Sequence, residues 1–415
     1  MPILQSVLGL FAFTAIAWLM SERRRQVRLR VILTGIFLQV AVGLVLLKVP
    51  LFQDLFLLLN RMVLSLEEAT RAGTAFVFGY IGGGDLPFDE KFPGASYVLG
   101  FQGLPLVVLM SALSALLFHW RILPLVVRAF ARALQKSMGI GGTEGVAVAA
   151  NVFVGMIEAP LLVRPYLGRM TRSELFTLMT SGMATIAGTV MVLYASILSG
   201  VIPDVMGHIL TASIISLPAA VTVAKIMVPE TRPLTPGTLS DPDPARSSMD
   251  AITRGTLQGV GLLINIVGML VVLVALVHLV NLVLGLLPAV GGLDLSLQRI
   301  LGWVMAPLVW LMGVPWAEAP SAGVLMGTKT ILNEFIAYLD LSHLAPGTLS
   351  PRSMLIMTYA LCGFANPGSL GIMIGGLGTM APERREEVVA LGLRSIVAGT
   401  LATAMTGCVV GIVGA

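Results

Sequence analysis

Charged residues are scarce in this chain. Only 12% of its 415 residues are Asp, Glu, Lys or Arg, whereas 56% are hydrophobic. A soluble domain has about 25% charged residues, so a water-soluble globule of this composition would expose more apolar surface than its polar groups could cover. The mean hydropathy of +0.91 agrees, and several apolar runs approach the roughly 20 residues that cross a bilayer. The sequence therefore predicts an all-α polytopic membrane protein.

Cysteine and catalytic motifs are also scarce. Cys362 and Cys408 are the only cysteines and both lie in apolar segments, so we infer no disulfide framework. The His-Glu-x-x-His and Gly-x-Ser-x-Gly motifs are missing, and the four histidines are too dispersed to hold a metal ion. A membrane-embedded enzyme is the alternative from another class, but the sequence offers no catalytic residues for it. The basic loops have no interleaved aromatic residues, so we expect no nucleic-acid partner.

The apolar runs predict eight transmembrane helices and two broken segments. An amphipathic stretch over residues 50–84 is assigned to the membrane interface because charged residues are spread among its apolar ones. Two further stretches, 139–168 and 313–341, are apolar but interrupted by Gly, Pro, Asn and Glu, which favours re-entrant helical hairpins. The eight spans are expected at about residues 3–20, 31–47, 97–120, 173–198, 205–228, 259–287, 352–378 and 386–413.

The basic residues fix the expected orientation. Five segments that alternating spans place on one side hold 19 of the 26 Lys and Arg residues: 21–30, 121–136, 164–172, 225–254 and 384–394. The positive-inside rule puts that side in the cytoplasm, so both termini are predicted outside. The first apolar run precedes its arginines, which is the order of a retained span and not of a secretory signal. We expect a multi-pass protein of the cell membrane, as in a bacterial inner membrane.

An internal repeat points to transport. Each hairpin carries a mid-membrane Glu and is followed by a span broken at Gly-x-Ala-polar, in residues 182–185 and 363–366. The predicted topology inverts one unit relative to the other, which is typical of secondary transporters. Glu158 and Glu334 lie in apolar runs, where an acid costs roughly 2.5 kcal/mol or more and usually faces a polar pathway. The alternative is a carboxylate that caps a half-helix within its hairpin.

Neutral oxygen donors lie beside the predicted breaks. Asn151, Thr185, Asn366 and Ser369 suit a monovalent cation when combined with unwound carbonyls. The alternative is ordinary hydrogen bonding between membrane helices. The chemistry of the residues alone leaves both interpretations open.

The motifs together resemble the concentrative nucleoside transporter family. The resemblance runs from about Val98 to the C-terminus and rests on four motifs: Asn151-Val-Phe-Val-Gly-Met-Ile-Glu158-Ala-Pro-Leu, Thr185-Ile-Ala-Gly188, Leu332-Asn-Glu-Phe335 and Cys362-Gly-Phe-Ala-Asn366. It implies a homotrimer in membrane lipid, whose protomers each carry a transport domain that moves as an elevator against a scaffold. The corresponding segments are 1–137 (scaffold, spans 1–3 and the interfacial helix), 138–231 (transport domain, hairpin 1 and spans 4–5), 232–312 (cytoplasmic loop and scaffold span 6) and 313–415 (transport domain, hairpin 2 and spans 7–8).

The resemblance also implies site residues. The family's sodium site falls on the side chains of Asn151 and Thr185 and the carbonyls of Val154 and Ile186. Its ribose-binding positions fall on Glu334, Asn366 and Ser369, and the positions near the base fall on Glu158, Val190 and Phe364.

One departure concerns the base. Met156 and Ile157 stand where the family usually has Gln followed by Thr or Ser, so two hydrogen-bonding side chains are replaced by apolar ones. We therefore expect a sodium-coupled nucleoside symporter whose base preference is shifted toward purine nucleosides. Proton coupling, or a modified nucleoside as substrate, is the alternative.

Overall fold

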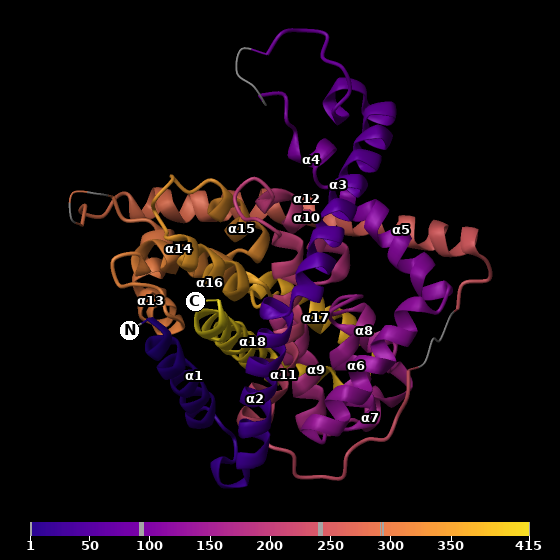
Figure 1. Cartoon of the computed structure of the whole chain (residues 1–415), viewed down its shortest axis with the longest axis vertical. Coiled ribbons are helices and arrows are strands. Elements are labelled where there is room, and N and C mark those ends of the chain that lie inside the picture. The colour runs from indigo at the N-terminus through magenta and orange to yellow at the C-terminus, as the bar shows by residue number, and fades with distance from the viewer. Residues whose placement is uncertain (1, 91–94, 240–243, 291, 293, 415) are drawn as a thin grey trace.

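The protein is all-helical, as predicted. The computed structural model describes residues 2–90, 95–239, 244–290, 292 and 294–414, and within these ranges the chain forms helices joined by loops and no β-strand. Both termini lie close together, at the free ends of the first and last helices (Figure 1). The first six α-helices are α1 (Pro2–Leu19), α2 (Leu29–Lys48), α3 (Pro50–Phe78), α4 (Leu99–Gln102), α5 (Leu106–His119) and α6 (Ile122–Met138).

The structure has helix–turn–helix segments at the two places where hairpins were expected, and their re-entrance into a membrane stays a prediction. The first consists of α7 (Gly142–Ala150) and α8 (Glu158–Leu161), and Gly155 in the turn between them has φ +94°, a left-handed conformation that favours glycine. The second consists of α14 (Ala319–Ile331) and α15 (Glu334–Ser342). Asn333 caps the N-terminus of α15, because its side-chain oxygen accepts a hydrogen bond from the backbone N–H of Ile336 at 2.9 Å.

The helices are interrupted at the two places where broken spans were expected. At the expected fourth span they are α9 (Arg172–Ala184) and α10 (Gly188–Leu198), and at the expected seventh span α16 (Pro351–Leu361) and α17 (Pro367–Met380). The second break packs against the end of α9: a Cβ at Gly363 would lie 2.9 Å from the carbonyl oxygen of Met183 and 3.1 Å from the carbonyl carbon of Ala184. Only glycine allows this break to approach the end of α9 so closely.

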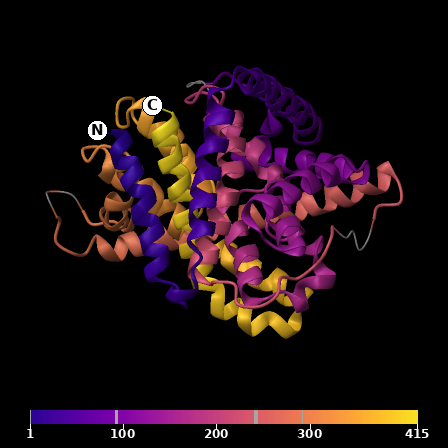
Figure 2. The same cartoon turned by 60° about the horizontal axis from the view of Figure 1, so that its bottom comes forward.

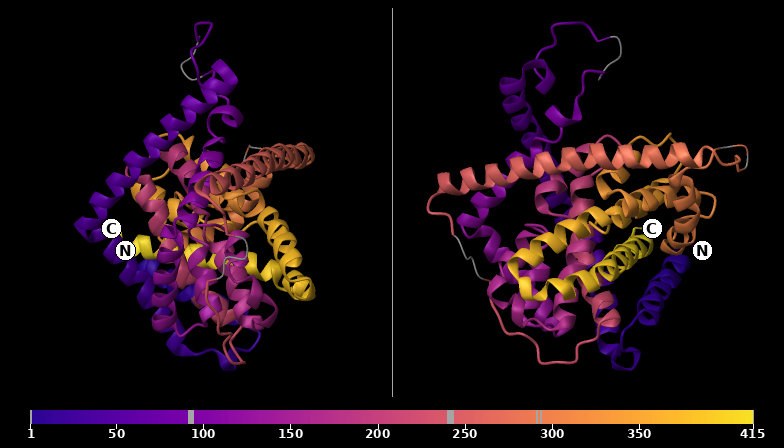
Figure 3. Two further views of the ribbon diagram at one scale, coloured as in Figure 1. Left: turned by 90° about the vertical axis from the view of Figure 1, so that its right-hand side faces the viewer. Right: turned by 180° about the vertical axis from the view of Figure 1, so that it is seen from behind.

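Two central helices organise the remainder. α11 (Val205–Met227) and α18 (Arg385–Val413) are buried along most of their length. α1 packs against α18 and α2 packs against α11, so the first two helices run beside the core (Figure 2). The long helix α12 (Ser248–Leu284) is mostly exposed and crosses the back of the molecule (Figure 3). It packs on α5 through Gly255 and Gly259, where added Cβ atoms would lie 2.6 and 2.7 Å from backbone atoms of α5.

One helix was not anticipated. α13 (Leu297–Met312) follows α12 and packs along α14, in a region to which the sequence analysis assigned no element. It has only 16 residues, too few for a full span. Among the residues that the structure describes, six helical stretches are long and apolar enough to cross a membrane: Leu29–Lys48, Leu99–His119, Arg172–Leu198, Val205–Met227, Ser248–Leu284 and Pro382–Val413. The protein is therefore multi-pass, and the full set of eight spans stays a prediction.

The close approach of Gly363 to the end of α9 can be tested with Gly363→Ala. The new Cβ would lie 2.8 Å from Cγ2 of Thr403 as well as against the backbone of α9, and overpacking of this kind costs about 1–3 kcal/mol. We expect lower thermal stability of the purified protein. Gly375→Ala in α17 is the matched control, because nothing lies within 4 Å of its added Cβ. Equal melting temperatures for the two variants would contradict the tight crossing.

Candidate functional site

Two of the four expected cation ligands are joined by one serine. Asn151 ends α7 and Thr185 ends α9, and both side chains are buried. The Asn151 Nδ2 donates a hydrogen bond to Oγ of Ser181 at 2.8 Å, and the Thr185 hydroxyl donates to the carbonyl oxygen of Ser181 at 2.9 Å. The Asn151 Oδ1 is buried and has no hydrogen-bond partner among the residues that the structure describes. A buried acceptor left unpaired in this way costs free energy unless a donor or a cation reaches it.

The other two expected ligands contribute backbone. Val154 lies in the turn of the first hairpin and Ile186 in the link between α9 and α10, so both are outside the helices. The turn and the link touch, because a Cβ at Gly155 would lie 2.9 Å from the Cβ of Ala187. Carbonyls of unwound membrane helices are the kind of group that coordinates sodium in transporters.

The expected sugar-binding residues form a hydrogen-bonded cluster. Glu334, the first residue of α15, is buried with 5% of its surface exposed. Nδ2 of Asn366 donates to its Oε2 at 3.1 Å. Asn366 also caps α17, since its Oδ1 accepts from the backbone N–H of Ser369 at 2.8 Å. The structure thus brings together all three polar residues that the sequence analysis named for the sugar.

Tyr194 belongs to the same cluster and was missed by the sequence analysis. Its hydroxyl donates to Oε1 of Glu334 at 2.7 Å, and its side chain is buried in α10. The signal in the sequence was a tyrosine inside an apolar run, because a buried tyrosine hydroxyl usually finds a partner. Its partner lies 140 positions away in the chain, and sequence reasoning had no means to identify it.

A buried lysine supports the cluster from behind. Lys329 of α14 is fully buried, and its ammonium donates to the carbonyl oxygen of Ala360 at 2.7 Å and to Oγ1 of Thr403 at 2.9 Å. Ala360 lies in the last turn of α16, directly before the break that leads to Asn366. The ammonium therefore ties hairpin 2, the broken seventh span and α18 together. Sequence analysis had given Lys329 no role.

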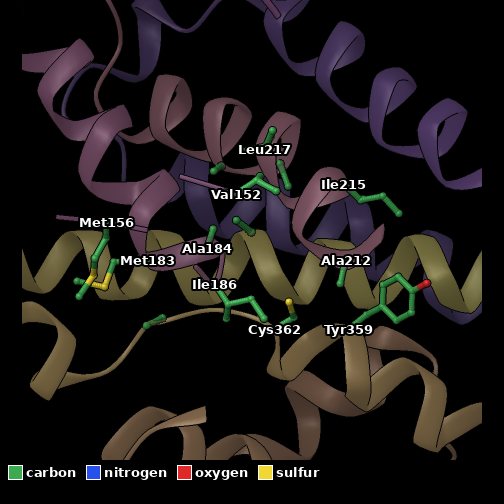
Figure 4. Packing of buried hydrophobic residues seen from close by; sticks show 14 of the residues in the cluster. Val152, Met156, Met183, Ala184, Ile186, Ala212, Ile215, Leu217, Tyr359 and Cys362 are labelled. Atoms are coloured by element: carbon green, nitrogen blue, oxygen red, sulfur yellow. The ribbon is translucent and has the colours of Figure 1, made fainter. Parts of the chain in front are cut away.

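The positions near the expected base differ in their surroundings. Glu158 begins α8 and its side chain is exposed, in contrast to Glu334. Met156 is buried beside Met183, and Ile186 lies next to Cys362, as Figure 4 shows. The Cδ1 of Ile157 lies 2.5 Å from a Cβ built at Gly376 of α17.

Val190 and Phe364 complete this group of positions. Val190 is buried in α10, and Phe364 is half-buried in the break of the seventh span. In this group Met156 packs toward α9 and Ile157 toward α17, and the apolar side chains at the expected base positions are part of the hydrophobic core.

An ion-pair cluster ties the expected cytoplasmic ends together. Glu22, in the loop between α1 and α2, accepts from Arg172 at 2.8 Å and from Arg394 at 2.5 Å. The hydrogen bond from Arg172 is the main reason that the pKa of Glu22 lies below its usual value. Arg172 begins α9 and Arg394 lies in α18. One carboxylate thus joins the first loop to two helices of the core.

Comparison with known proteins decides the family. Models described as the Na+ dependent nucleoside transporter N-terminus and C-terminus match residues 8–81 and 208–411, and a nucleoside recognition (Gate) model matches residues 101–200. The uncharacterized transporter YutK of Bacillus subtilis is 37% identical over 99% of this chain and 100% of its own. The chain belongs to the concentrative nucleoside transporter family. Family membership makes it a nucleoside transporter and not an enzyme, which confirms two predictions.

Other relatives and solved structures agree. The putative nucleoside permease NupX of Escherichia coli is 34% identical over 99% of both chains. Mouse solute carrier family 28 member 3 is 36% identical over 97% of this chain and 58% of its own. The structure of CNTnw in an inward-facing substrate-bound state superposes with a TM-score of 0.90 at 36% identity, covering 100% of this chain and 98% of that one. An outward-facing CNTnw structure superposes with a TM-score of 0.89, so the likeness does not select one state.

Proposed function

We propose that this transporter is a sodium-coupled nucleoside symporter of a bacterial inner membrane, working as an elevator in a homotrimer. The observation that carries the proposal is the buried carboxylate of Glu334 held beside Asn366 at the break of the seventh span. A carboxylate and an amide can each engage two groups, which suits the vicinal hydroxyls of ribose. Ser369, one turn into α17, completes the proposed sugar site.

Sodium is the proposed co-transported ion. The residues present fit it, because Asn151 offers a buried oxygen without a partner and Thr185 adds a hydroxyl oxygen. The carbonyls of Val154 and Ile186 complete the proposed set. Unwound backbone with neutral oxygens suits a monovalent cation better than a proton. Proton coupling is the second candidate, and the exposed carboxylate of Glu158 is the observation that favours it.

The packing suggests a revised division of the moving parts. Residues 1–137 were expected to form scaffold, yet α1 packs on α18 and α2 on α11. The side chain of Ser6 donates to the carbonyl oxygen of Met312 at 2.8 Å, and Glu22 joins α9 and α18. We therefore assign α1 and α2 to the transport domain together with both hairpins. The paired helices α5 and α12 remain in the scaffold, and the exposed apolar surface of α12 is the proposed face toward lipid and the other protomers.

The coupling ion can be tested by uptake into proteoliposomes. With the expected orientation, an inward sodium gradient should drive accumulation of a nucleoside, and a proton gradient alone should not. Thr185→Val removes one oxygen at nearly constant volume, so uptake should need a higher sodium concentration for half-maximal rate. Thr180→Val is the matched control, because the Thr180 hydroxyl is buried in the same helix without a partner. Uptake that follows the proton gradient, or an unchanged sodium dependence in Thr185→Val, would contradict sodium binding here.

Base preference is the second test. Met156 and Ile157 cannot hydrogen-bond a base edge, and Met packs well against aromatic rings. We therefore expect purine nucleosides to bind at least as tightly as uridine. The double change Met156→Gln with Ile157→Thr should improve uridine relative to adenosine by roughly 0.5–1.5 kcal/mol for each hydrogen bond gained.

Competition binding on both proteins measures the ratio of uridine to adenosine affinity. Because Met156 and Ile157 pack against α9 and α17, an unchanged ratio would also have a structural explanation. If the ratio does not change, these two residues act as core, and Glu158, Val190 and Phe364 remain as the candidates for base selection.

A further inference from the structure

Tyr194 and Glu334 belong to different units of the predicted repeat, although their side chains are in contact. Glu334 belongs to hairpin 2, whereas Tyr194 lies on α10, the second half of the broken span that follows hairpin 1. The 2.7 Å hydrogen bond from the Tyr194 hydroxyl to Oε1 of Glu334 is buried. This contact is thus a buried side-chain link between the two predicted repeats at the proposed sugar site.

The two oxygens of Glu334 are held by different donors. Tyr194 donates to Oε1 and Asn366 Nδ2 donates to Oε2 at 3.1 Å. Each carboxylate oxygen has two lone pairs, so each one keeps a second acceptor position after these bonds. Holding both oxygens prevents rotation of the carboxylate about its last torsion. The free acceptor positions then have a fixed spacing and direction.

The ring of Tyr194 is itself held in place. Its centroid lies 5.2 Å from that of Tyr338 and 6.2 Å from that of Phe335, both on α15. Side-chain distances of this order are typical of packed aromatic pairs. The hydroxyl therefore has little freedom to leave Glu334, and the carboxylate is oriented before a substrate arrives. Preorganisation of this kind reduces the free energy that binding must spend on ordering the site.

We infer that Tyr194 is a positioning residue that makes the sugar site selective for vicinal diols. It acts through Glu334, which with Tyr194 and Asn366 in place presents two fixed acceptor positions, one for each hydroxyl of a ribose. A deoxynucleoside uses only one of them and depends less on the fixed tilt of the carboxylate. This inference rests on the proposed function, because it needs Glu334 to bind the sugar.

The test is nucleoside binding by calorimetry to purified protein, with uridine, 2′-deoxyuridine and 3′-deoxyuridine. Tyr194→Phe keeps the ring and removes the hydroxyl. We expect about tenfold weaker uridine binding and about twofold weaker deoxyuridine binding, since a hydrogen bond to a charged group is involved. The ratio between the two affinities therefore falls about fivefold.

Tyr338→Phe is the matched control. Its hydroxyl donates to the carbonyl oxygen of Thr358 at 2.8 Å in the same buried aromatic cluster and does not bond Glu334. We expect the ratio of uridine to deoxyuridine affinity to stay at the wild-type value in this variant. A fall of the same size in both variants would reassign Tyr194 to general packing and overturn the inference.

A double-mutant cycle with Glu334→Gln checks that Tyr194 acts through the carboxylate. In the Glu334→Gln background, Tyr194→Phe should change uridine affinity by less than about twofold, because residues that share one interaction are not additive. An equal loss in both backgrounds would overturn the inference, as would a Tyr194→Phe protein that cannot be purified folded while Tyr338→Phe can. Failure of the wild-type protein to bind any nucleoside would instead overturn the proposed function, and this inference with it.

Discussion

The packing of the hairpins and the interrupted helices depends on one constraint. Backbone that leaves a helix at membrane depth must find polar partners or be covered by protein. The chain has two such places in its broken spans, and it packs one of them against the end of the helix before the other. Gly363 of one break lies against the carbonyl of Met183 and the backbone of Ala184, the last residues of α9 before the other break. The turn of the first hairpin lies at the same place, with Phe153 against Gly188. The candidate cation and sugar residues lie at these breaks and turns.

The charges inside this region follow from the same constraint. A buried carboxylate is tolerated only with strong hydrogen bonds around it, and Glu334 has them from Tyr194 and Asn366. Lys329 is the other buried charge of hairpin 2, and it donates to the end of α16 and to Thr403 of α18. The two buried charged side chains thus bond the second hairpin to different elements: Glu334 to α10 and Asn366, and Lys329 to α16 and α18. The hairpin is fixed by the same polar groups that the proposed sugar site needs, which couples the shape of the site to the stability of the domain.

The parts that sequence predicted are those in which a polar residue interrupts an apolar run. Glu334, Asn366, Asn151 and Thr185 stand out because glycine, proline and polar groups are costly in a membrane helix, and the structure places them at hairpin turns and helix breaks. The hairpins, the broken spans and the all-helical class followed from the same signal. The sequence did not predict the tertiary contacts. These include the hydrogen-bond partner of Tyr194 and the packing of α1 and α2 on the core. The sequence places Met156 where the family has a Gln near the base, whereas in the fold its side chain packs beside Met183 (Figure 4).

The two units of the predicted repeat carry different chemistry, and α10 lies between them. The first unit has neutral oxygens from Asn151 and Thr185, whereas the second has the carboxylate of Glu334. On the proposed assignment, the link before α10 contributes the carbonyl of Ile186 to sodium, and α10 itself carries Tyr194 to the sugar carboxylate. Binding at either site then biases the position of the same short helix. Coupling between two ligands is reciprocal, so an ion that settles the start of α10 raises nucleoside affinity by the same factor by which the nucleoside raises affinity for the ion. A symporter needs that relation, and on the proposed assignment α10, a helix of 11 residues, is the element that borders both sites.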